Sequence, residues 1–325
     1  MSYVLRRLGF YALAAWASLT LNFFLPRFMP GDPADAVLGK LQGQVRPETI
    51  DAMRKAYGLS DAPLWQQYFD YLGNIFRGQL GVSLSQFPTP VTQIIGQSFI
   101  WTILLGLTAT ILSFLIGNFL GILGAWRRGG LVDSVMPPLL MFIGSFPYFW
   151  LAIVALFFLS FEWGYFPLRH AYSDNLSPAF TLQFLGSVAY HLVLPAASLI
   201  VISIGGWVLG MRNAMIATLS EDYVTMAEAK GLSQRRVMFN YAARNAMLPS
   251  VTAFGMQLGF VLSGSLLTEI VFSYPGLGFQ LITAVRNLDY PLMQGIFLGI
   301  TFGVLIANLL VDLLYVRLDP RVRGA

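Results

Sequence analysis

Long apolar segments alternate with short polar connections along this chain of 325 residues. A helix needs about 20 mostly apolar residues to cross a bilayer, and in lipid its backbone groups must be satisfied within the segment. Six segments meet this requirement, at about 8–29, 98–125, 135–161, 191–211, 248–272 and 292–316. Acidic and basic residues are absent from 8–25, 98–126, 134–161, 175–211 and 245–268. The pattern predicts an all-α integral membrane protein with six transmembrane helices.

The first apolar segment follows Arg6-Arg7, as the apolar core of a secretory signal peptide also follows basic residues. It is longer than such a core, and no small-residue cleavage site comes between it and Pro30. We therefore predict a retained helix.

Basic residues predict the orientation of the helices, because short cytoplasmic connections are enriched in Lys and Arg. With the N-terminus inside, the inner segments hold Arg6, Arg7, Arg127, Arg128, Arg212, Lys230, Arg235, Arg236, Arg244, Arg317, Arg321 and Arg323. Most of the remaining basic residues lie in one long outer loop, where this rule has little weight. We predict that both termini are cytoplasmic.

The long outer loop, at about 30–97, is predicted to contain two helices. The first opens at Pro47, with Ile50, Met53 and Tyr57 on one face. The second begins after Asp61, with Pro63 near its first position. Its apolar and aromatic positions are Leu64, Trp65, Tyr68, Phe69, Tyr71 and Ile75. This pattern fits an amphipathic helix at the bilayer surface, an outer cap that meets a delivery protein, or both.

A polar segment at about 213–247 separates two apolar runs and is longer than a simple turn requires. Ser220 is predicted to cap a helix that begins at Glu221-Asp222, and Gly231 to end it. Ser233 is predicted to cap a second helix that runs toward Asn245. Ala227, Ala229 and Leu232 would form a face that a partner's groove could accept. We interpret the segment as the docking site of a soluble motor on a transport subunit that is driven by other proteins.

Composition supports a membrane protein and excludes several chemistries. The chain is 56% hydrophobic and only 11% charged, whereas soluble domains carry about 25% charged residues. Cysteine is absent, so disulfide and thiolate chemistry are excluded. His170 and His191 are not paired on one helix, and His191 is predicted to mark the start of the fourth span. The net charge of +4 is spread over the loops, which fits a membrane face better than a nucleic-acid surface.

Enzymatic and metal-binding motifs are also missing from the sequence. There is neither a phosphate-binding GxxxxGK[ST] loop nor an HExxH motif. Gly276-x-Gly278 lacks the strand–helix context of a dinucleotide site and predicts a turn after Pro275. We predict no catalytic residue, no metal site and no cofactor bound by this chain.

Polar residues inside the apolar segments are candidates for a translocation pathway, because such residues are costly in lipid and often functional. The candidates are Asn118, Gln257, Ser263 and Glu269. Glu269 could instead reach the membrane surface, and the others, with Thr268, could join helices by hydrogen bonds. Near the end of the last span, Asp312 is predicted to pair with Arg317.

Proline and glycine positions predict bends and close helix contacts. Pro137, Pro138 and Pro147 should kink or break the third span. Small-xxx-small spacing, which lets helices approach closely, starts at Gly117, Gly206, Gly255, Gly295 and Gly299. No internal repeat is visible, which disfavours a secondary transporter built from inverted repeats.

Several motifs together resemble one family. They are Pro30-Gly31-Asp32-Pro33, Tyr57-Gly58-Leu59, Gly78-x-Leu80-Gly81-x-Ser83, Ala227-x-Ala229-Lys230-Gly231-Leu232-Ser233, Arg244-Asn245-Ala246-x-Leu248-Pro249, Tyr274-Pro275-Gly276-Leu277-Gly278, Asp289-Tyr290-Pro291-Leu292 and Asp319-Pro320-Arg321. In these motifs the chain resembles the permease subunits of bacterial ABC importers of type I, and most closely the B-type subunit of the oligopeptide, dipeptide and nickel group. The resemblance covers nearly the whole chain.

The resemblance implies a heteromer in the cytoplasmic membrane of a bacterium or archaeon. A second, homologous permease subunit would complete the pathway, two ATPase subunits would hold ATP and Mg, and an extracytoplasmic binding protein would deliver the cargo. The residues implied in ATPase coupling are Thr225, Met226, Ala227, Glu228, Ala229, Lys230, Gly231, Leu232 and Ser233. The family's motif is Glu-Ala-Ala followed by Gly four residues after the last Ala. Ala227 and Gly231 keep its last two positions, and Thr225 and Met226 replace its first two.

The expected organisation is a first span at 1–29, an outer loop at 30–97, a permease core at 98–316 that includes the coupling region 213–247, and a cytoplasmic tail at 317–325. The expected function is ATP-driven import of di- or oligopeptides by alternating access, with ATPase closure pushing on residues 226–233. Oligosaccharides and nickel remain open as cargo, with nickel least favoured. A self-standing channel or receptor remains open as a different class.

Overall fold

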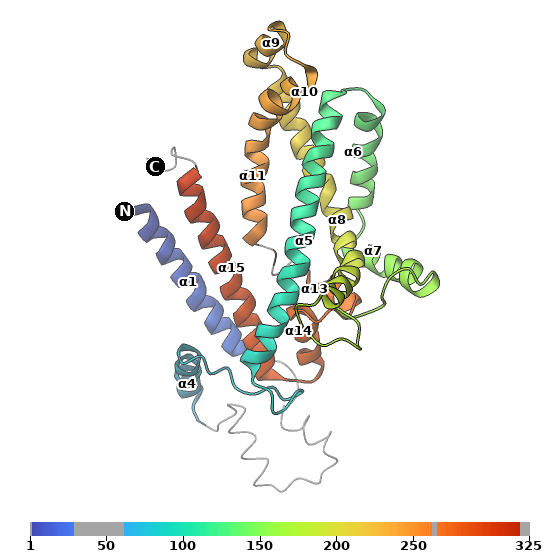
Figure 1. Cartoon of the computed structure of the whole chain (residues 1–325). Helices are drawn as coiled ribbons and strands as arrows, with labels where there is room; N and C mark the ends of the chain where they lie inside the picture. The colour runs from blue at the N-terminus through green and yellow to red at the C-terminus, as the bar shows by residue number, and fades with distance from the viewer. Residues whose placement is uncertain (1, 29–61, 260, 262–264, 319–325) are drawn as a thin grey trace. The chain divides into compact units, whose positions relative to one another are not determined.

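The computed structural model describes residues 2–28, 62–259, 261 and 265–318, and these residues are almost entirely helical (Figure 1). Within these ranges the extended pairing is a single bridge between Val82 and Pro90. The predicted all-α fold class is therefore confirmed. The first predicted outer-loop helix, near Pro47, lies outside the described residues, and so do the side chains of Asp312 and Arg317.

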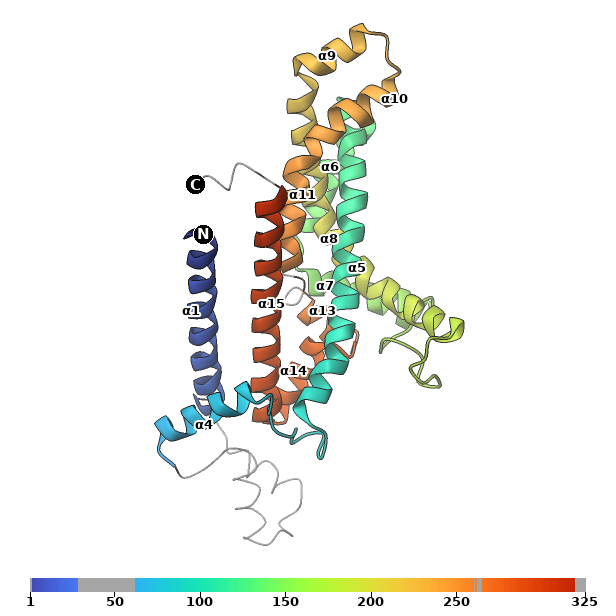
Figure 2. The ribbon, with the colours of Figure 1, turned by 60° about the vertical axis from the view of Figure 1, so that its left-hand side comes forward.

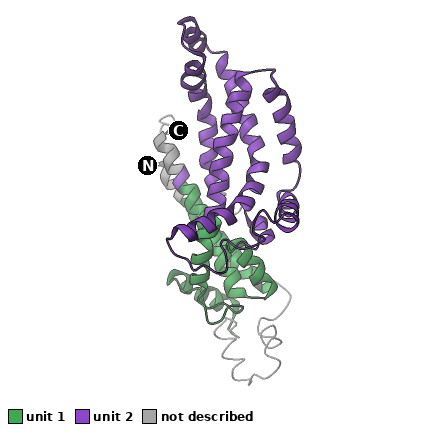
Figure 3. Cartoon of the chain, turned by 45° about the vertical axis from the view of Figure 1, so that its right-hand side comes forward, with its two compact units in different colours: residues 1–102, 275–309, 320–325 green, residues 103–274, 310–319 purple. Residues whose placement is uncertain are grey.

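The chain divides into two compact units, which Figure 3 colours separately. Unit 1 contains residues 1–102, 275–309 and 320–325, and unit 2 contains residues 103–274 and 310–319. Two helices contribute to both units along their length: α5 (Val91–Trp126) and α15 (Tyr290–Leu318).

Unit 1 is built on α1 (Ser2–Phe24), α4 (Leu64–Phe76), α14 (Leu277–Arg286), the first turns of α5 and most of α15. Its core joins the start of α5 to the start of α15. A Cβ added to Gly295 would lie 2.4 Å from Val91 Cγ1, so only glycine allows this contact. The core consists of Val91, Ile94, Leu277, Ala284, Tyr290, Leu292, Met293 and Ile296.

A buried carboxylate organises the segment before α5. Asp289 accepts hydrogen bonds from the Ser83 hydroxyl and from the backbone N–H and hydroxyl of Ser85 (2.9 and 2.8 Å). Its other oxygen accepts from the N–H of Leu292 (3.1 Å) in the first turn of α15. A carboxylate is favourable at a helix N-terminus because the free N–H groups there carry partial positive charge. Two motifs that lie about 200 residues apart are thus joined by one side chain.

Unit 2 is organised around α8 (Leu182–Leu219), beside which α6 (Leu131–Gly144), α11 (Arg244–Gly259) and the second part of α5 run (Figures 1 and 2). It also contains α7 (Tyr148–Ala155), a π-helical segment at Leu156–Glu162, and α13 (Leu266–Val271). At one end lie α9 (Asp222–Ala229) and α10 (Gln234–Arg236), which a second π-helical segment, Val237–Ala243, connects to α11.

Glycines set the distance between α5 and α8. A Cβ at Gly117 would lie 2.4 Å from Trp207 Cβ, and one at Gly121 would lie 2.7 Å from the carbonyl oxygen of Val208. The predicted close helix contacts are confirmed here, and in unit 1 at Gly295. The spacing that starts at Gly206 behaves differently, because added Cβ atoms at Gly206 and Gly210 would meet nothing within 4 Å among the described residues.

Three described helices are long and apolar enough to cross a membrane, and they coincide with the predicted second, fourth and sixth spans: Val91–Trp126, Leu182–Leu219 and Tyr290–Val311. The predicted first span corresponds to α1, whose apolar part is Gly9–Phe24. The count of six spans remains a prediction. One boundary was wrong: His191 does not open the fourth span but is buried in the third turn of α8, where its Nδ1 contacts the Ser187 carbonyl (2.8 Å).

The predicted third span is broken, as its prolines indicated. Its two helices, Leu131–Gly144 and Tyr148–Glu162, are bent by 95° at the break. Pro147 stands immediately before α7 with extended backbone (ψ 130°) and cannot donate a backbone hydrogen bond. Pro137 and Pro138 are accommodated within α6. The chain therefore turns at Pro147.

The predicted fifth span is described in part. Helix α11 is described up to Gly259, Val261 is helical, and α13 runs from Leu266 after a turn at Ser265. That these parts form one span remains a prediction.

An ion pair fixes the connection between α5 and α6. Asp133, in the first turn of α6, accepts from Arg212 Nε on α8 and from the N–H of Gly129 (2.9 Å). Asp133 is buried and Arg212 is partly exposed. Removing one partner would leave a poorly solvated charge in place.

We expect Gly121→Ala to lower the free energy of unfolding by about 1–3 kcal/mol, because the new methyl group would press on the α8 backbone. Thermal unfolding of the purified chain in detergent measures the effect. Gly124→Ala is the control on the same helix, since its Cβ would meet no described atom within 4 Å. Equal unfolding temperatures for the two variants would contradict the proposed contact.

Arg212→Met is expected to cost about 2–3 kcal/mol of stability, because it leaves Asp133 without its charged donor. The double variant Asp133→Asn/Arg212→Met should lose less than the sum of the two single variants. The same unfolding assay completes this double-mutant cycle, with Arg127→Met at an exposed position as the control. Additive losses would show that the pair does not interact.

Candidate functional site

The polar segment predicted from the sequence forms a helical lobe at one end of unit 2 (Figures 1 and 2). Helix α9 covers Asp222–Ala229, the chain turns at Gly231, and α10 begins at Gln234. Continuous helical structure then runs from Gln234 to Gly259. The lobe is therefore connected to α8 on one side and to α11 on the other.

Gly231 ends α9 as predicted. Its φ is +73°, a left-handed conformation that glycine adopts without a steric penalty. The Gly231 N–H donates to the carbonyl of Glu228 (2.9 Å), and the Leu232 N–H donates to that of Ala227 (3.4 Å). This pair of bonds is a Schellman motif, which satisfies carbonyls that the helix leaves free. The turn between the two helices is thus set by the backbone of Gly231.

Of the two predicted N-terminal caps, only Ser233 of the second helix occupies the predicted position. Glu221, not Ser220, occupies the capping position of α9, and the Ser220 hydroxyl donates to the Ala217 carbonyl (2.8 Å) at the end of α8. Ser233 does precede α10, and its carbonyl accepts from Arg236 (2.8 Å).

One face of α9 is buried in the core of unit 2. Val224 and Ala227 pack into a cluster contributed by the ends of α5 and α8 and by the segment leading into α11. Ala227 is only 3% exposed, and Leu232 is partly buried against the same cluster. The prediction that Ala227 faces a partner's groove is therefore wrong, because this side chain is buried against its own chain. For the partly buried Leu232 it remains a prediction. The other buried members of the cluster are Ile122, Ala125, Met211, Met215, Val237, Met238, Ala242, Ala243 and Ala246.

The opposite face of α9 is exposed and chemically mixed. Met226 is 58% exposed, and an unbranched thioether adapts easily to a partner surface. The other exposed coupling positions are Thr225, Glu228, Ala229, Lys230, Gly231 and Ser233. Apolar and charged groups therefore share a surface that is held rigidly from behind.

A cavity of about 190 Å³ lies within unit 2, between α5, α7, α8 and the end of α11. Hydroxyl groups, one amide and two aromatic rings form much of its wall, and none of its lining residues is charged. The lining residues are Gly106, Ala109, Thr110, Ser113, Tyr148, Leu199, Ile202, Ser203, Trp207, Gln257, Val261 and Ser265.

The structure brings two of the four predicted pathway residues to this cavity. Gln257 lines it directly. Glu269 is completely buried beside it, and its Oε1 accepts from the hydroxyl of Ser265, which is a lining residue (2.8 Å). Asn118 lies elsewhere on α5, buried, with its amide donating to the Phe114 carbonyl (2.7 Å). Ser263 is outside the described residues.

Most of the lining residues were not identified from the sequence. Thr110 and Ser113 share one face of α5, and Ser203 starts an exposed stripe on α8 that continues through Gly206, Gly210 and Asn213. Their helical spacing is visible in the sequence. Which of several such faces borders a cavity depends on the packing of α5, α7 and α8.

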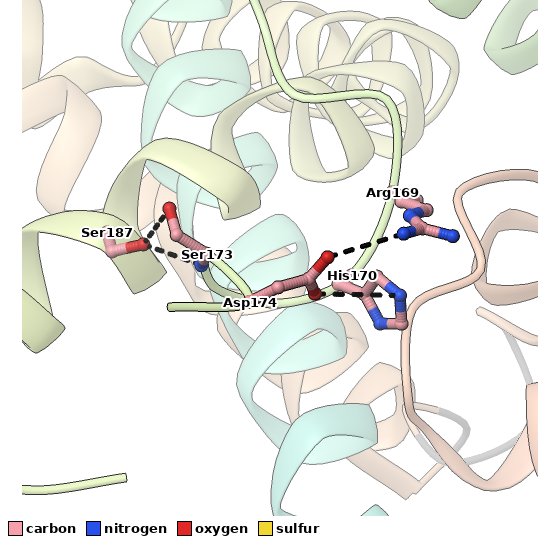
Figure 4. A network of polar contacts seen from close by, with 5 residues as sticks. All are labelled: Arg169, His170, Ser173, Asp174 and Ser187. Carbon is pink, nitrogen blue, oxygen red and sulfur yellow. Dashed lines mark hydrogen bonds and ion pairs between the residues drawn. The ribbon is translucent and has the colours of Figure 1, made fainter. Parts of the chain in front are cut away.

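A separate polar network shapes the loop before α8 (Figure 4). Asp174 lies between Arg169 (3.3 Å) and His170 (3.9 Å), and the Ser187 hydroxyl accepts from the Ser173 N–H (2.9 Å). His170 has a left-handed backbone (φ 66°), and its N–H donates to the Phe272 carbonyl (3.2 Å). Arg169 and Asp174 are largely exposed, so their ion pair contributes little stability. The network holds the loop and offers no evident chemistry.

Two family profiles match the sequence and together cover nearly all of it. Residues 117–324 match the family described as "Binding-protein-dependent transport system inner membrane component". Residues 1–113 match the N-terminal component described for the same kind of membrane protein.

Individual relatives agree over the full length. The chain is 36% identical to the dipeptide transport system permease protein DppB of Escherichia coli over 340 aligned residues, which cover 99% of each protein. It is 36% identical to a di/tripeptide transport system permease of Pseudomonas aeruginosa and 32% identical to a dipeptide permease of Lactococcus lactis, again over 99% of each chain. The chain therefore belongs to the family of inner membrane components of binding-protein-dependent transport systems.

Proposed function

We propose that this chain is the permease subunit of an ATP-driven importer that moves di- or oligopeptides inward by alternating access. Its partners are a second homologous permease subunit, two ATPase subunits that bind ATP and Mg, and an extracytoplasmic binding protein. The chain itself binds no cofactor and catalyses no reaction. Both termini, and the α9 lobe, lie on the cytoplasmic side. Relatives over the full length that transport peptides support this assignment.

Helix α9 is buried on one face and exposed on the other, and this is the observation that carries the coupling role. A helix that only connected two spans could expose all its faces to water. Here Val224 and Ala227 anchor α9 to the ends of α5 and α8, while Met226 and Lys230 remain accessible. A force applied to the exposed face would pass directly into the membrane helices, because the buried face cannot slide over a close-packed core.

The cavity and the stripe on α8 support a pathway through unit 2. Ser203 belongs to both, and the stripe continues past it with Gly206, Gly210 and Asn213. Hydroxyl and amide groups can exchange hydrogen bonds with the peptide groups of a passing cargo, and no lining charge would trap it. We assign Gln257 to the wall of this pathway, and the buried Glu269 to a position behind the wall, where it accepts from the lining residue Ser265.

Peptides are favoured as cargo because the relatives that align over the whole chain are named for peptides. The cavity wall would also suit an oligosaccharide, whose hydroxyls match the same groups. Nickel is less favoured: among the described residues, no three His, Asp or Glu side chains gather as a metal site would require. A self-standing channel or receptor would not need the α9 lobe.

Gly231→Pro is expected to abolish uptake of a labelled dipeptide while the subunit remains in the membrane. Proline cannot adopt φ +73° and has no N–H for the bond to Glu228. Uptake is measured in cells that express the whole transporter and its binding protein, with membrane levels checked by immunoblot.

Gly231→Asn is the matched control, because asparagine tolerates the left-handed region. It should keep most of the uptake. Normal uptake by Gly231→Pro would reject the coupling role of this turn. Uptake of a labelled oligosaccharide or of nickel, with no peptide uptake by the unmodified transporter, would reject the peptide assignment alone.

Met226→Asp is expected to reduce the ATPase recovered with the tagged permease by at least about tenfold, because a charge would be buried at the contact. The assay is purification of the complex in mild detergent followed by mass spectrometry. Met226→Leu, which keeps an apolar group of similar size, should recover wild-type amounts. Recovery of the unmodified chain alone, without ATPase or a second permease, would favour a channel or receptor.

A further inference from the structure

Helix α4 lies across the end of α1 rather than continuing along it (Figure 2). Two tyrosines attach it there. Tyr68 shares a hydrogen bond with the Thr20 hydroxyl (2.8 Å), and the Asn22 amide donates to the Tyr71 hydroxyl (3.1 Å). Both rings also pack on Phe23. Burial raises the pKa of the Tyr71 phenol to about 12.

A third attachment joins the two helices at the same place. The Arg27 guanidinium stacks 3.6 Å from the centre of the Phe23 ring and donates to Gln67 Oε1 (3.1 Å). Since α1 is an apolar helix that ends at Phe24, these contacts hold α4 at the level where a membrane-inserted α1 would leave the bilayer.

The rest of α4 divides into an apolar and a polar face. Trp65, Phe69 and Phe76 follow one another at helical spacing and are 67%, 65% and 84% exposed. The neighbouring stripe is polar and contains Gln66, Asp70, Asn74 and Arg77, all of them exposed. The face toward α1, the apolar face and the polar face therefore point in three different directions.

Exposed apolar side chains also lie on α1 and just beyond it. Trp16 and Leu21 are exposed on α1, and Phe28 is exposed four residues after its end. On a transmembrane helix such side chains contact acyl chains, and aromatic residues concentrate at the boundary between acyl chains and headgroups. A helix with one aromatic and one charged face, fixed at that level, has the properties of an interfacial helix.

We propose that α4 lies in the headgroup layer of the bilayer and binds the phospholipid surface itself, with Trp65, Phe69 and Phe76 among the acyl chains and Asp70 and Arg77 in water. The occupant of this apolar face is lipid rather than the delivery protein. The inference depends on the membrane insertion of α1 and is independent of cargo and of ATPase coupling.

The absence of cysteine makes a direct test possible, because one introduced thiol gives a single labelling site on the full-length chain. Phe69→Cys and Asp70→Cys form a matched pair on neighbouring positions of opposite character. Each variant is labelled with an environment-sensitive fluorophore and placed in phosphatidylcholine nanodiscs, with and without spin-labelled lipid. Iodide in the buffer probes access from water.

Spin-labelled lipid should quench the label at position 69 about twofold more than the label at position 70, and iodide should show the opposite order. Phe76→Cys and Arg77→Cys repeat the comparison at the end of the helix, should either of the first variants fold poorly. Equal access of iodide to both labels would overturn the proposal. Shielding of position 69 only after addition of the purified binding protein would overturn it in favour of a protein partner.

Discussion

The close approach of α5 and α8 is the contact on which unit 2 depends. Apolar helices gain little from leaving lipid for each other, because lipid tails are equally apolar. Association then relies on packing at short range, which Gly117 and Gly121 permit by removing the side chains between the two backbones. With α8 held in this way, α6 and α11 pack around it. The ends of α5 and α8 then provide the apolar seat for Val224 and Ala227 of α9.

The packing of Val224 and Ala227 against α5 and α8 explains how the α9 lobe can form although two residues of the family's Glu-Ala-Ala motif are replaced. Thr225 and Met226, which differ from the family's pattern, are exposed and do not pack in the chain's own core. Ala227 and Gly231, which keep the pattern, have positions that tolerate little else: Ala227 fits into the cluster, and Gly231 adopts a left-handed turn. Of these four positions, the two that match the pattern shape the lobe, and the two that differ from it are exposed.

Several hydroxyl groups of unit 2 donate hydrogen bonds to backbone carbonyls in the preceding turn of their own helix. The hydroxyl of Ser113 donates to the Thr110 carbonyl (3.1 Å), and that of Ser203 donates to the Leu199 carbonyl (2.7 Å). Such local bonds lower the cost of placing hydroxyls at membrane depth. They are also easily exchanged for bonds to a visiting ligand. A wall of this kind suits transient contact better than tight binding, as a transport pathway requires.

The sequence by itself determined the helical class, the position of most helices and the turn at Gly231. These follow from local physics, since lipid forces apolar segments into helices and a left-handed turn selects glycine. Only the tertiary structure decided that Ala227 faces inward, and that Gln257 and Ser265 share a cavity wall while Asn118 does not. Likewise, no local pattern connects Asp289 to Ser83 and Ser85. Lipid surrounds a membrane helix with apolar groups on every side. A hydropathy pattern therefore does not tell which side of the helix will pack against its neighbours, and only the tertiary structure decides this.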